Sequence, residues 1–160
     1  MDLRLFPGVI LKQFTAREMV SGWDMLEVRR RATATAATSF LDTLERHLPF
    51  PVRALQVDGG SEFAALFEAA CRQRGLRLFV LPPRSPQLNG QVERANRTHT
   101  EEFYEVTPFL LPLAELNREL QAWEWTYNTV RPHQALAYLA PQERASSGLV
   151  RVSGKRGLSC

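Results

Sequence analysis

Two short stretches of this 160-residue chain decide its fold: VDGGSEF at residues 57–63 and PQLNGQVER at residues 86–94. The first begins at the end of an apolar run typical of a buried strand, so Asp58 stands directly after a strand. The second opens with proline, asparagine and glycine and continues into a helical pattern that carries Glu93. Two acids brought together from separate elements can hold a hard divalent cation through carboxylate oxygens. Metal-dependent phosphoryl transfer uses such an arrangement.

The hydrophobic pattern around these stretches predicts an α/β domain. Strands are predicted at residues 3–6, 9–20, 23–29, 52–57 and 76–81, and helices at residues 33–47, 62–74, 86–103 and 112–129. An antiparallel meander followed by strands that alternate with helices predicts a mixed sheet with helices on both faces. Residues 146–160 are rich in serine, glycine and arginine, so we predict one domain over residues 1–145 and a flexible tail over 146–160.

The composition is that of an ordinary soluble globular protein, with 44% hydrophobic and 23% charged residues. We find no apolar run of membrane-spanning length and no secretory signal pattern, and the two cysteines have no motif spacing. A reducing cytoplasm is therefore the expected compartment. The net charge of +3 suits a polyanionic partner but indicates little alone. Arg84, Arg94 and Arg97 matter more, because they flank the proposed acidic site.

These motifs resemble those of the DDE-type transposases and retroviral integrases, and within them the integrase core of bacterial insertion-sequence transposases. The resemblance covers most of residues 50–145 and extends to EEFY at 101–104, YN at 127–128 and RPHQAL at 131–136. It implies a ribonuclease-H-like fold with a five-stranded mixed sheet flanked by helices. It also implies that residues 1–145 are an integrase catalytic core that is truncated at its N-terminus, with a shortened first strand.

By the same resemblance, Asp2, Asp58 and Glu93 are the catalytic residues and metal ligands. Each has a plainer interpretation: Asp58 as part of a turn, and Glu93 as a solvated helix acid paired with a nearby arginine. The joint occurrence of both motifs favours the ligand role for these two. For Asp2, the alternative of an unremarkable residue at a frayed terminus stays open. The family usually has asparagine at the position of Gly59.

The resemblance implies a magnesium-dependent polynucleotidyl transferase that cleaves DNA ends and transfers strands during DNA integration. Two Mg²⁺ or Mn²⁺ ions are expected, and carboxylates suffice to hold them. Arg84, Asn89, Arg94 and Arg97 are predicted to bind DNA, the arginines through phosphates, which is positioning rather than sequence recognition. Transposon ends and target DNA are the expected partners. The protein is expected to form a homodimer or higher oligomer in the bacterial cytoplasm, associated with the nucleoid and not with a membrane.

Two alternative functions remain from the sequence. The chain could be a catalytically inactive, truncated core that serves as a DNA-binding or dimerising module, as the start of the first strand at Asp2 and the departures from the family pattern at Gly59 and Arg17-Glu18 suggest. A strand-transfer assay with magnesium separates this alternative from an active core. Ribonuclease-H-like hydrolysis of RNA in hybrids is a third hypothesis, which the motifs at 86–94 and 131–136 disfavour.

Overall fold

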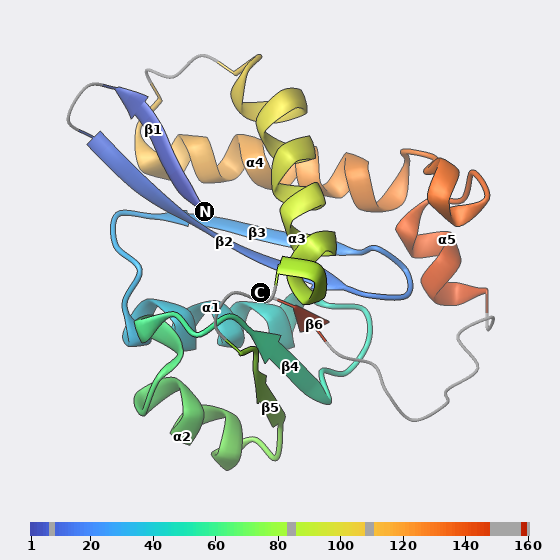
Figure 1. Ribbon diagram of the computed structural model, residues 1–160. Coiled ribbons are helices and arrows are strands. Elements are labelled where there is room, and N and C mark those ends of the chain that lie inside the picture. The colour runs from blue at the N-terminus through green and yellow to red at the C-terminus, as the bar shows by residue number, and fades with distance from the viewer. Residues whose placement is uncertain (7–8, 83–85, 108–110, 148–157, 160) are drawn as a thin grey trace.

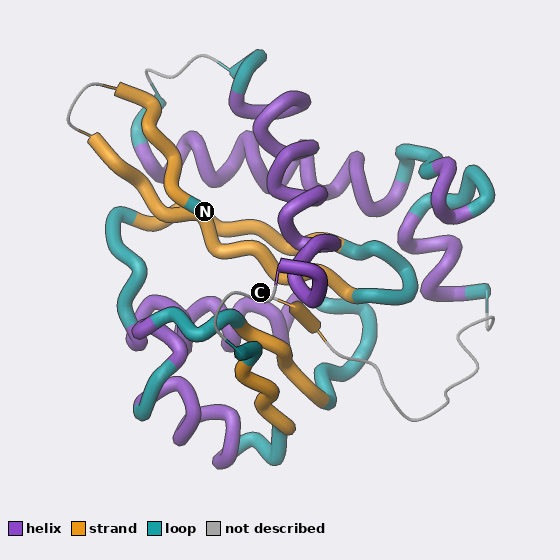
Figure 2. The backbone as a smooth tube through the Cα atoms, viewed as in Figure 1, coloured by secondary structure: helices purple, strands orange, loops and turns teal. Residues whose placement is uncertain are grey.

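The computed structural model describes residues 1–6, 9–82, 86–107, 111–147 and 158–159. Figure 1 shows a sheet with α3 and α4 on one side and α1 and α2 on the other, and Figure 2 shows the same arrangement of helix and strand. The strands are β1 (Asp2–Phe6), β2 (Val9–Glu18), β3 (Asp24–Arg29), β4 (Ala54–Val57), β5 (Arg77–Val80) and β6 (Leu158–Ser159). The helices are α1 (Ala34–His47), η1 (Ser61–Phe63), α2 (Leu66–Gln73), α3 (Pro86–His99), η2 (Thr100–Tyr104), α4 (Leu113–Thr129), η3 (Gln134–Leu136) and α5 (Pro141–Ser146).

The sheet consists of two parts, which corrects the predicted five-stranded mixed sheet. Strands β1, β2 and β3 form an antiparallel group, and β4 and β5 form a parallel pair. Among the described residues, only the two-residue strand β6 joins these groups, antiparallel to β2 and parallel to β4. The sheet is divided because β1 is short. It pairs with β2 only from Val9 to Lys12, and β6 pairs with the same edge of β2 farther along, at Arg17 and Glu18.

The strand register shows that β1 and β6 lie along the same edge of β2. Lys12 pairs with Asp2 of β1 on one side and with Arg29 of β3 on the other. Arg17 likewise pairs with β3 on one side and with Ser159 of β6 on the other. Since β3 occupies one edge throughout, β1 and β6 follow each other along the opposite edge, which faces β4. The predicted flexible tail lies mostly outside the described residues, and its residues 158–159 form this strand.

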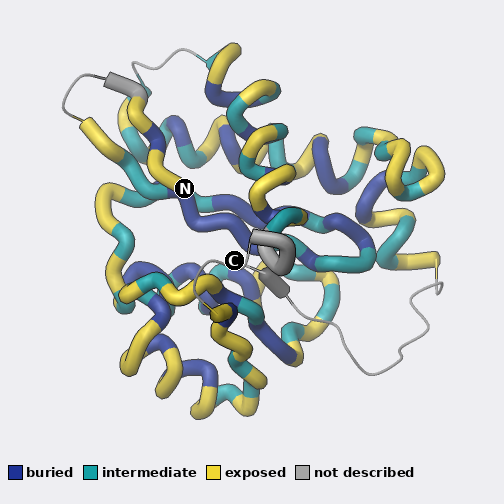
Figure 3. The backbone as a smooth tube through the Cα atoms, in the orientation of Figure 1, coloured by how far each residue is buried: buried dark blue, intermediate teal, exposed yellow. Residues whose placement is uncertain are grey.

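Two hydrophobic cores lie on opposite faces of the antiparallel strands, because successive side chains of a strand point to opposite faces. Phe14 and Ala16 of β2 join α1, η1, α2 and β4 in the first core. Leu26 and Val28 of β3 join η2 and α4 in the second. Figure 3 shows buried backbone at the centre of the sheet and exposed backbone on the outer helices. Burial raises the pKa of the Cys71 thiol in the first core to about 11, so this cysteine is a protonated, structural group at neutral pH.

Polar side chains of α4 cover the outer edge of β3. Asn117 accepts the N–H of Val28 and donates to its carbonyl, both at 2.8 Å. Asn128 does the same for Asp24, at 2.9 and 2.7 Å. Between them, Glu124 accepts the N–H of Leu26 at 2.7 Å. These contacts satisfy backbone groups that an edge strand otherwise leaves unpaired, and they fix α4 against the sheet.

Two predicted helices differ in detail from those observed. The helix predicted at residues 62–74 is split into η1 and α2 by Ala65, whose φ of 32° is outside the helical region. The split turns both pieces against α1, where Phe63 and Phe67 pack with ring centroids 5.2 Å apart. The helix predicted at residues 86–103 ends in a π-helical turn, η2. No helix in the described part of the chain is long and apolar enough to cross a membrane.

Candidate active site

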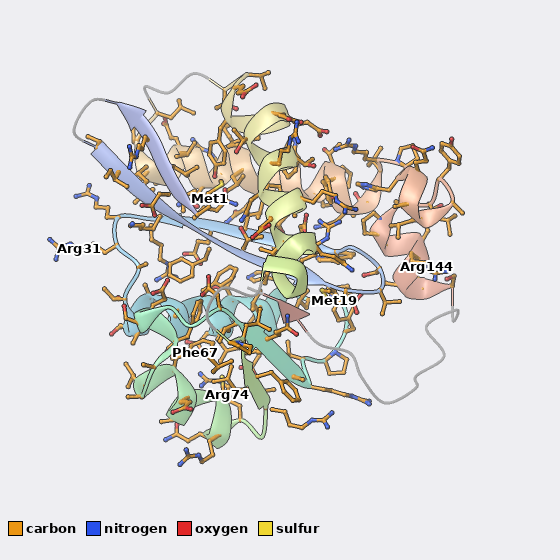
Figure 4. The ribbon with its side chains drawn as sticks, in the orientation of Figure 1. Met1, Met19, Arg31, Phe67, Arg74 and Arg144 are labelled. Carbon is orange, nitrogen blue, oxygen red and sulfur yellow. The ribbon has the colours of Figure 1, made fainter. Side chains whose placement is uncertain are left out.

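Asp2 and Asp58 line one pocket of about 330 Å³. Asp2 begins β1, and Asp58 follows the last residue of β4, so the two carboxylates come from the two different parts of the sheet. Both residues are exposed, which leaves their oxygens accessible from solvent. Met1, labelled in Figure 4, marks the β1 end of this pocket. The structure therefore brings together two of the three predicted metal ligands.

Glu93, the third predicted ligand, is exposed and does not line this pocket. The residues of α3 that line the pocket are Val92 and Asn96. Glu93 precedes Asn96 by three residues, and residues three apart are neighbours on a helix surface. No group of three or more histidine, cysteine, aspartate or glutamate side chains in the described residues is placed to hold a metal ion. The structure thus places Glu93 beside the pocket without joining it to the two aspartates.

Glu62 lines the pocket as well, although it is not among the site residues predicted from the sequence. The absence of a side chain at Gly60 leaves room for the carboxylate of Glu62 in the pocket. A Cβ atom at Gly60 would lie 2.8 Å from Oε2 of Glu62 and 3.2 Å from Oδ1 of Asp58, so both carboxylates occupy space that the glycine leaves open. The signal in the sequence is a pair of acids that flank two glycines.

Lys12 is paired with Asp2 in this pocket. Its ammonium nitrogen lies 2.6 Å from Oδ1 of Asp2. This hydrogen bond holds the pKa of Asp2 below its ordinary value, and the charge of Lys12 adds to the effect. A cation that binds Asp2 must therefore compete with Lys12.

Polar side chains of β2, α3 and η2 are hydrogen-bonded to one another beside the pocket. Oδ1 of Asn96 accepts hydrogen bonds from Thr15 at 2.8 Å and from Nε2 of Gln13 at 3.3 Å. The hydroxyl of Tyr104 donates to Oε1 of Gln13 at 2.6 Å. Because buried polar groups are costly unless they are satisfied, this set fixes α3 in one position on β2.

The hydrogen-bonded chain continues away from the pocket through His99. Nδ1 of this ring lies 3.1 Å from Nε2 of Gln13, which is a donor, so Nδ1 is the acceptor. Nε2 of His99 then donates to Oδ2 of Asp24 at 3.1 Å. The same oxygen accepts from Arg17 at 2.6 Å, and Arg17 also reaches the hydroxyl of Tyr127. Although burial opposes its charge, Asp24 and Tyr127 raise the pKa of Arg17 above its ordinary value.

The predicted DNA-binding residues are placed differently from one another. Arg94 is exposed on α3, and no side chain in the described residues pairs with its guanidinium group. Arg97 is exposed too, but its Nε lies 2.8 Å from Oε1 of Glu101. Asn89 lies on α3, and its side chain is outside the described set. Arg84 lies outside the described residues.

The donor chemistry of the pocket suits a hard divalent cation. Asp2, Asp58 and Glu62 offer only carboxylate oxygens, which are the ligands that Mg²⁺ and Mn²⁺ prefer. Magnesium needs few protein ligands, because it keeps water and substrate oxygens in its coordination shell. The few carboxylates that line this pocket could therefore supply the protein ligands of such an ion.

Comparison with known proteins identifies sequence relatives. Residues 74–141 match the family model described as the integrase core domain. The chain is 32% identical over 107 residues to an uncharacterised 31.7 kDa protein of insertion element IS407 from Burkholderia multivorans. This match covers 66% of the chain and 38% of the relative, so the chain spans well under two thirds of that protein.

Solved structures share the fold at lower sequence identity. A chain in the simian T-cell lymphotropic virus intasome in complex with PP2A regulatory subunit B56 gamma is similar over 97% of this chain and 55% of its own length, with a TM-score of 0.79 and 21% identity. The catalytic core domain of BIV integrase is similar over 89% of both chains, with a TM-score of 0.67 and 24% identity. The HTLV-2 integrase catalytic core domain in complex with magnesium is similar over 90% of both chains, with a TM-score of 0.70 and 17% identity.

Proposed function

Because this chain is related to the DDE-type transposases and retroviral integrases, we propose that it is the catalytic core of a DNA transposase. In this proposal it is a metal-dependent polynucleotidyl transferase that cleaves DNA ends and joins them to target DNA. One observation carries the proposal: Asp2 and Asp58, from separate parts of the sheet, line the same accessible pocket. This pocket is referred to below as the acidic pocket.

Asp2 and Asp58 would hold the metal ions, with Glu93 as the third ligand from α3. Bound Mg²⁺ or Mn²⁺, two ions in all, would activate the attacking oxygen and neutralise charge on the phosphate. Arg94 and Arg97, with Asn89 and Arg84, would position the DNA through its backbone. The buried bonds of Asn96 to Gln13 and Thr15 would keep α3 in place against the pocket.

The relatives support DNA as the partner and assembly of several copies. The curated relative belongs to an insertion element of a bacterium, and one structural neighbour is part of a viral intasome. Another was solved with magnesium in a trimeric form. We accordingly propose transposon ends and target DNA as substrates, a homodimer or larger assembly, and action at the bacterial nucleoid.

The first test is binding of Mn²⁺ or Mg²⁺ by isothermal calorimetry, followed by a strand-transfer assay on DNA ends. Asp58→Asn should lose metal binding and transfer, because it removes a charged ligand with almost no change in shape. Glu93→Gln should lose transfer. Glu119→Gln, an exposed position on α4, is the matched control and should change neither. Equal transfer by the wild type and Asp58→Asn would overturn the proposal.

The alternative function, a DNA-binding or dimerising module without catalysis, is supported by two features of the acidic pocket. Glu93 does not line it, and Lys12 already pairs with Asp2. If the wild type binds DNA but neither binds metal nor transfers strands, this alternative replaces the first.

A further inference from the structure

A second pocket, of about 460 Å³, lies on the other side of α3 from the acidic pocket. Helix α3 contributes Val92 and Asn96 to the acidic pocket but Gln91, Arg94 and Thr98 to the second. The rest of its lining comes from the β2–β3 turn, from Tyr127 of α4 and from residues 133–136; the turn contributes Arg17, Met19, Val20 and Gly22. Met19, labelled in Figure 4 near the lower end of α3, is part of its lining.

The charge of this second pocket is opposite to that of the acidic pocket. Its described lining includes arginine, histidine and glutamine side chains but no aspartate or glutamate. Within the described residues, Arg94, Gln91 and Gln134 have no side-chain hydrogen-bond partner. His133 is not a free donor: its Nε2 donates to the carbonyl of Tyr127 at 3.1 Å, and burial lowers its pKa, so Nδ1 of the neutral ring is an acceptor. Hydrogen-bond donors that are gathered in one hollow and not used by the protein suit an anionic ligand.

We propose that this second pocket binds a backbone phosphate of the DNA strand whose reacting phosphate lies in the acidic pocket. The proposal rests on the proposed function, because it assigns the second pocket to the same substrate. A helix with its side chains is about 10–12 Å across. A DNA strand advances about 3.4 Å along the duplex axis per nucleotide. Neighbouring phosphates of a strand lie farther apart than this axial rise, because the strand also winds around the axis, so the phosphate in the second pocket would lie within a few nucleotides of the reacting one.

The buried hydrogen-bonded chain fixes the two pockets relative to each other. It begins at Asn96, which lines the acidic pocket, and passes through Gln13, His99 and Asp24. It ends at Arg17, which lines the second pocket and is 2.6 Å from Asp24. Since Asp24 neutralises Arg17, Arg94 is the residue that supplies unpaired charge to the phosphate. Arg97 differs, because Glu101 engages it.

The test is DNA binding by fluorescence anisotropy in EDTA over a series of salt concentrations, so that no metal contributes. Arg94→Ala should weaken binding and lower the slope of log affinity against log salt by about 0.9, the value for one phosphate of duplex DNA. Arg94→Lys should keep the slope, because it keeps the charge. Gln91→Ala with Gln134→Ala should weaken binding without changing the slope. Arg72→Ala, exposed on α2, is the control and should match the wild type.

Equal slopes for Arg94→Ala and Arg72→Ala would overturn the second pocket, as would a wild type that binds no DNA in EDTA. Thermal melting monitored by circular dichroism verifies that each variant is folded. The same experiments distinguish failure of this proposal from failure of the proposed function. If the wild type binds DNA normally but transfers no strands, the proposed catalysis is wrong and the proposal for the second pocket stands. If the wild type transfers strands and Arg94→Ala has the same salt slope as the wild type, the proposal for the second pocket is wrong and the proposed catalysis stands.

Discussion

The ammonium nitrogen of Lys12 lies 2.6 Å from Oδ1 of Asp2, directly across the β1–β2 pair. This contact engages one of the two aspartates that line the acidic pocket and lowers its pKa. Whether Asp2 serves a metal ion or only Lys12 can be decided at this pair, because the lysine can be changed without touching either aspartate.

Lys12→Gln should tighten Mn²⁺ binding, because the metal no longer competes with the ammonium group for Asp2. A unit charge about 4 Å away is worth about 1 kcal/mol in water, which corresponds to an affinity change of about fivefold. Calorimetric titration measures it, and Lys12→Arg, which keeps the charge, is the control. Unchanged affinity in Lys12→Gln would mean that Asp2 takes no part in metal binding.

The two glycines after Asp58 should respond differently to an added methyl group. A Cβ at Gly59 meets nothing within 4 Å, so Gly59→Ala should keep metal affinity and raise the free energy of unfolding by about 0.4–1 kcal/mol through the unfolded chain. A Cβ at Gly60 lies 2.8 Å from Glu62, so Gly60→Ala should displace that carboxylate and weaken metal binding. Calorimetry and urea denaturation on both variants test this pair, and equal metal affinities would contradict it.

The sequence predicted the fold where short-range signals and the motifs agree. The strand before Asp58 and the helix that carries Glu93 are both observed, because each has a clear apolar period and turn residues at its boundary. The position of Glu62 in the acidic pocket was not predicted, since the approach of its carboxylate to Gly60 is visible only in three dimensions. Periodicity also could not reveal the break at Ala65, where the apolar spacing of a helix continues through a non-helical residue.

Long-range contacts account for the remaining differences. Strand β6 pairs Leu158 with Glu18 and Leu55, partners more than a hundred residues away in the chain. A two-residue strand has no periodicity by which the sequence could identify it. Similarly, Asn117 and Asn128 look like ordinary polar residues of a surface helix, yet they bind both backbone groups of Val28 and Asp24.

Asn128→Ala should lower the free energy of unfolding by about 2–3 kcal/mol, because it leaves the buried N–H and carbonyl of Asp24 without their partner. Gln121→Ala, at an exposed position of the same helix, controls for the change in helix propensity. Urea denaturation followed by circular dichroism measures the difference between the two variants. A loss of the same size in both would show that the edge of β3 does not depend on this side chain.

Glu124 should make the protein less stable as the pH rises. Burial raises the pKa of this carboxyl from its usual 4.5 to about 8; the Leu26 N–H opposes this shift, and the charge of Asp24 adds to it. Below pH 4.5 the group is protonated in both states, so its contribution to stability is fully present. Between pH 4.5 and about 8 the unfolded chain releases this proton and the folded chain keeps it, so stability falls over this range.

Glu124→Gln should remove that dependence, because glutamine is neutral and its carbonyl oxygen can still accept the Leu26 N–H, now 2.7 Å away. We expect the variant to match the wild type near pH 4.5 and to exceed it near pH 8 by up to about 5 kcal/mol, since the pKa shift from 4.5 to about 8 is about 3.5 units and each unit is worth about 1.4 kcal/mol. Urea denaturation at both pH values measures the two differences. Glu119→Gln, on the exposed face of α4, should leave the pH dependence intact. Parallel stability curves for the wild type and Glu124→Gln would show that this carboxyl ionises equally in both states.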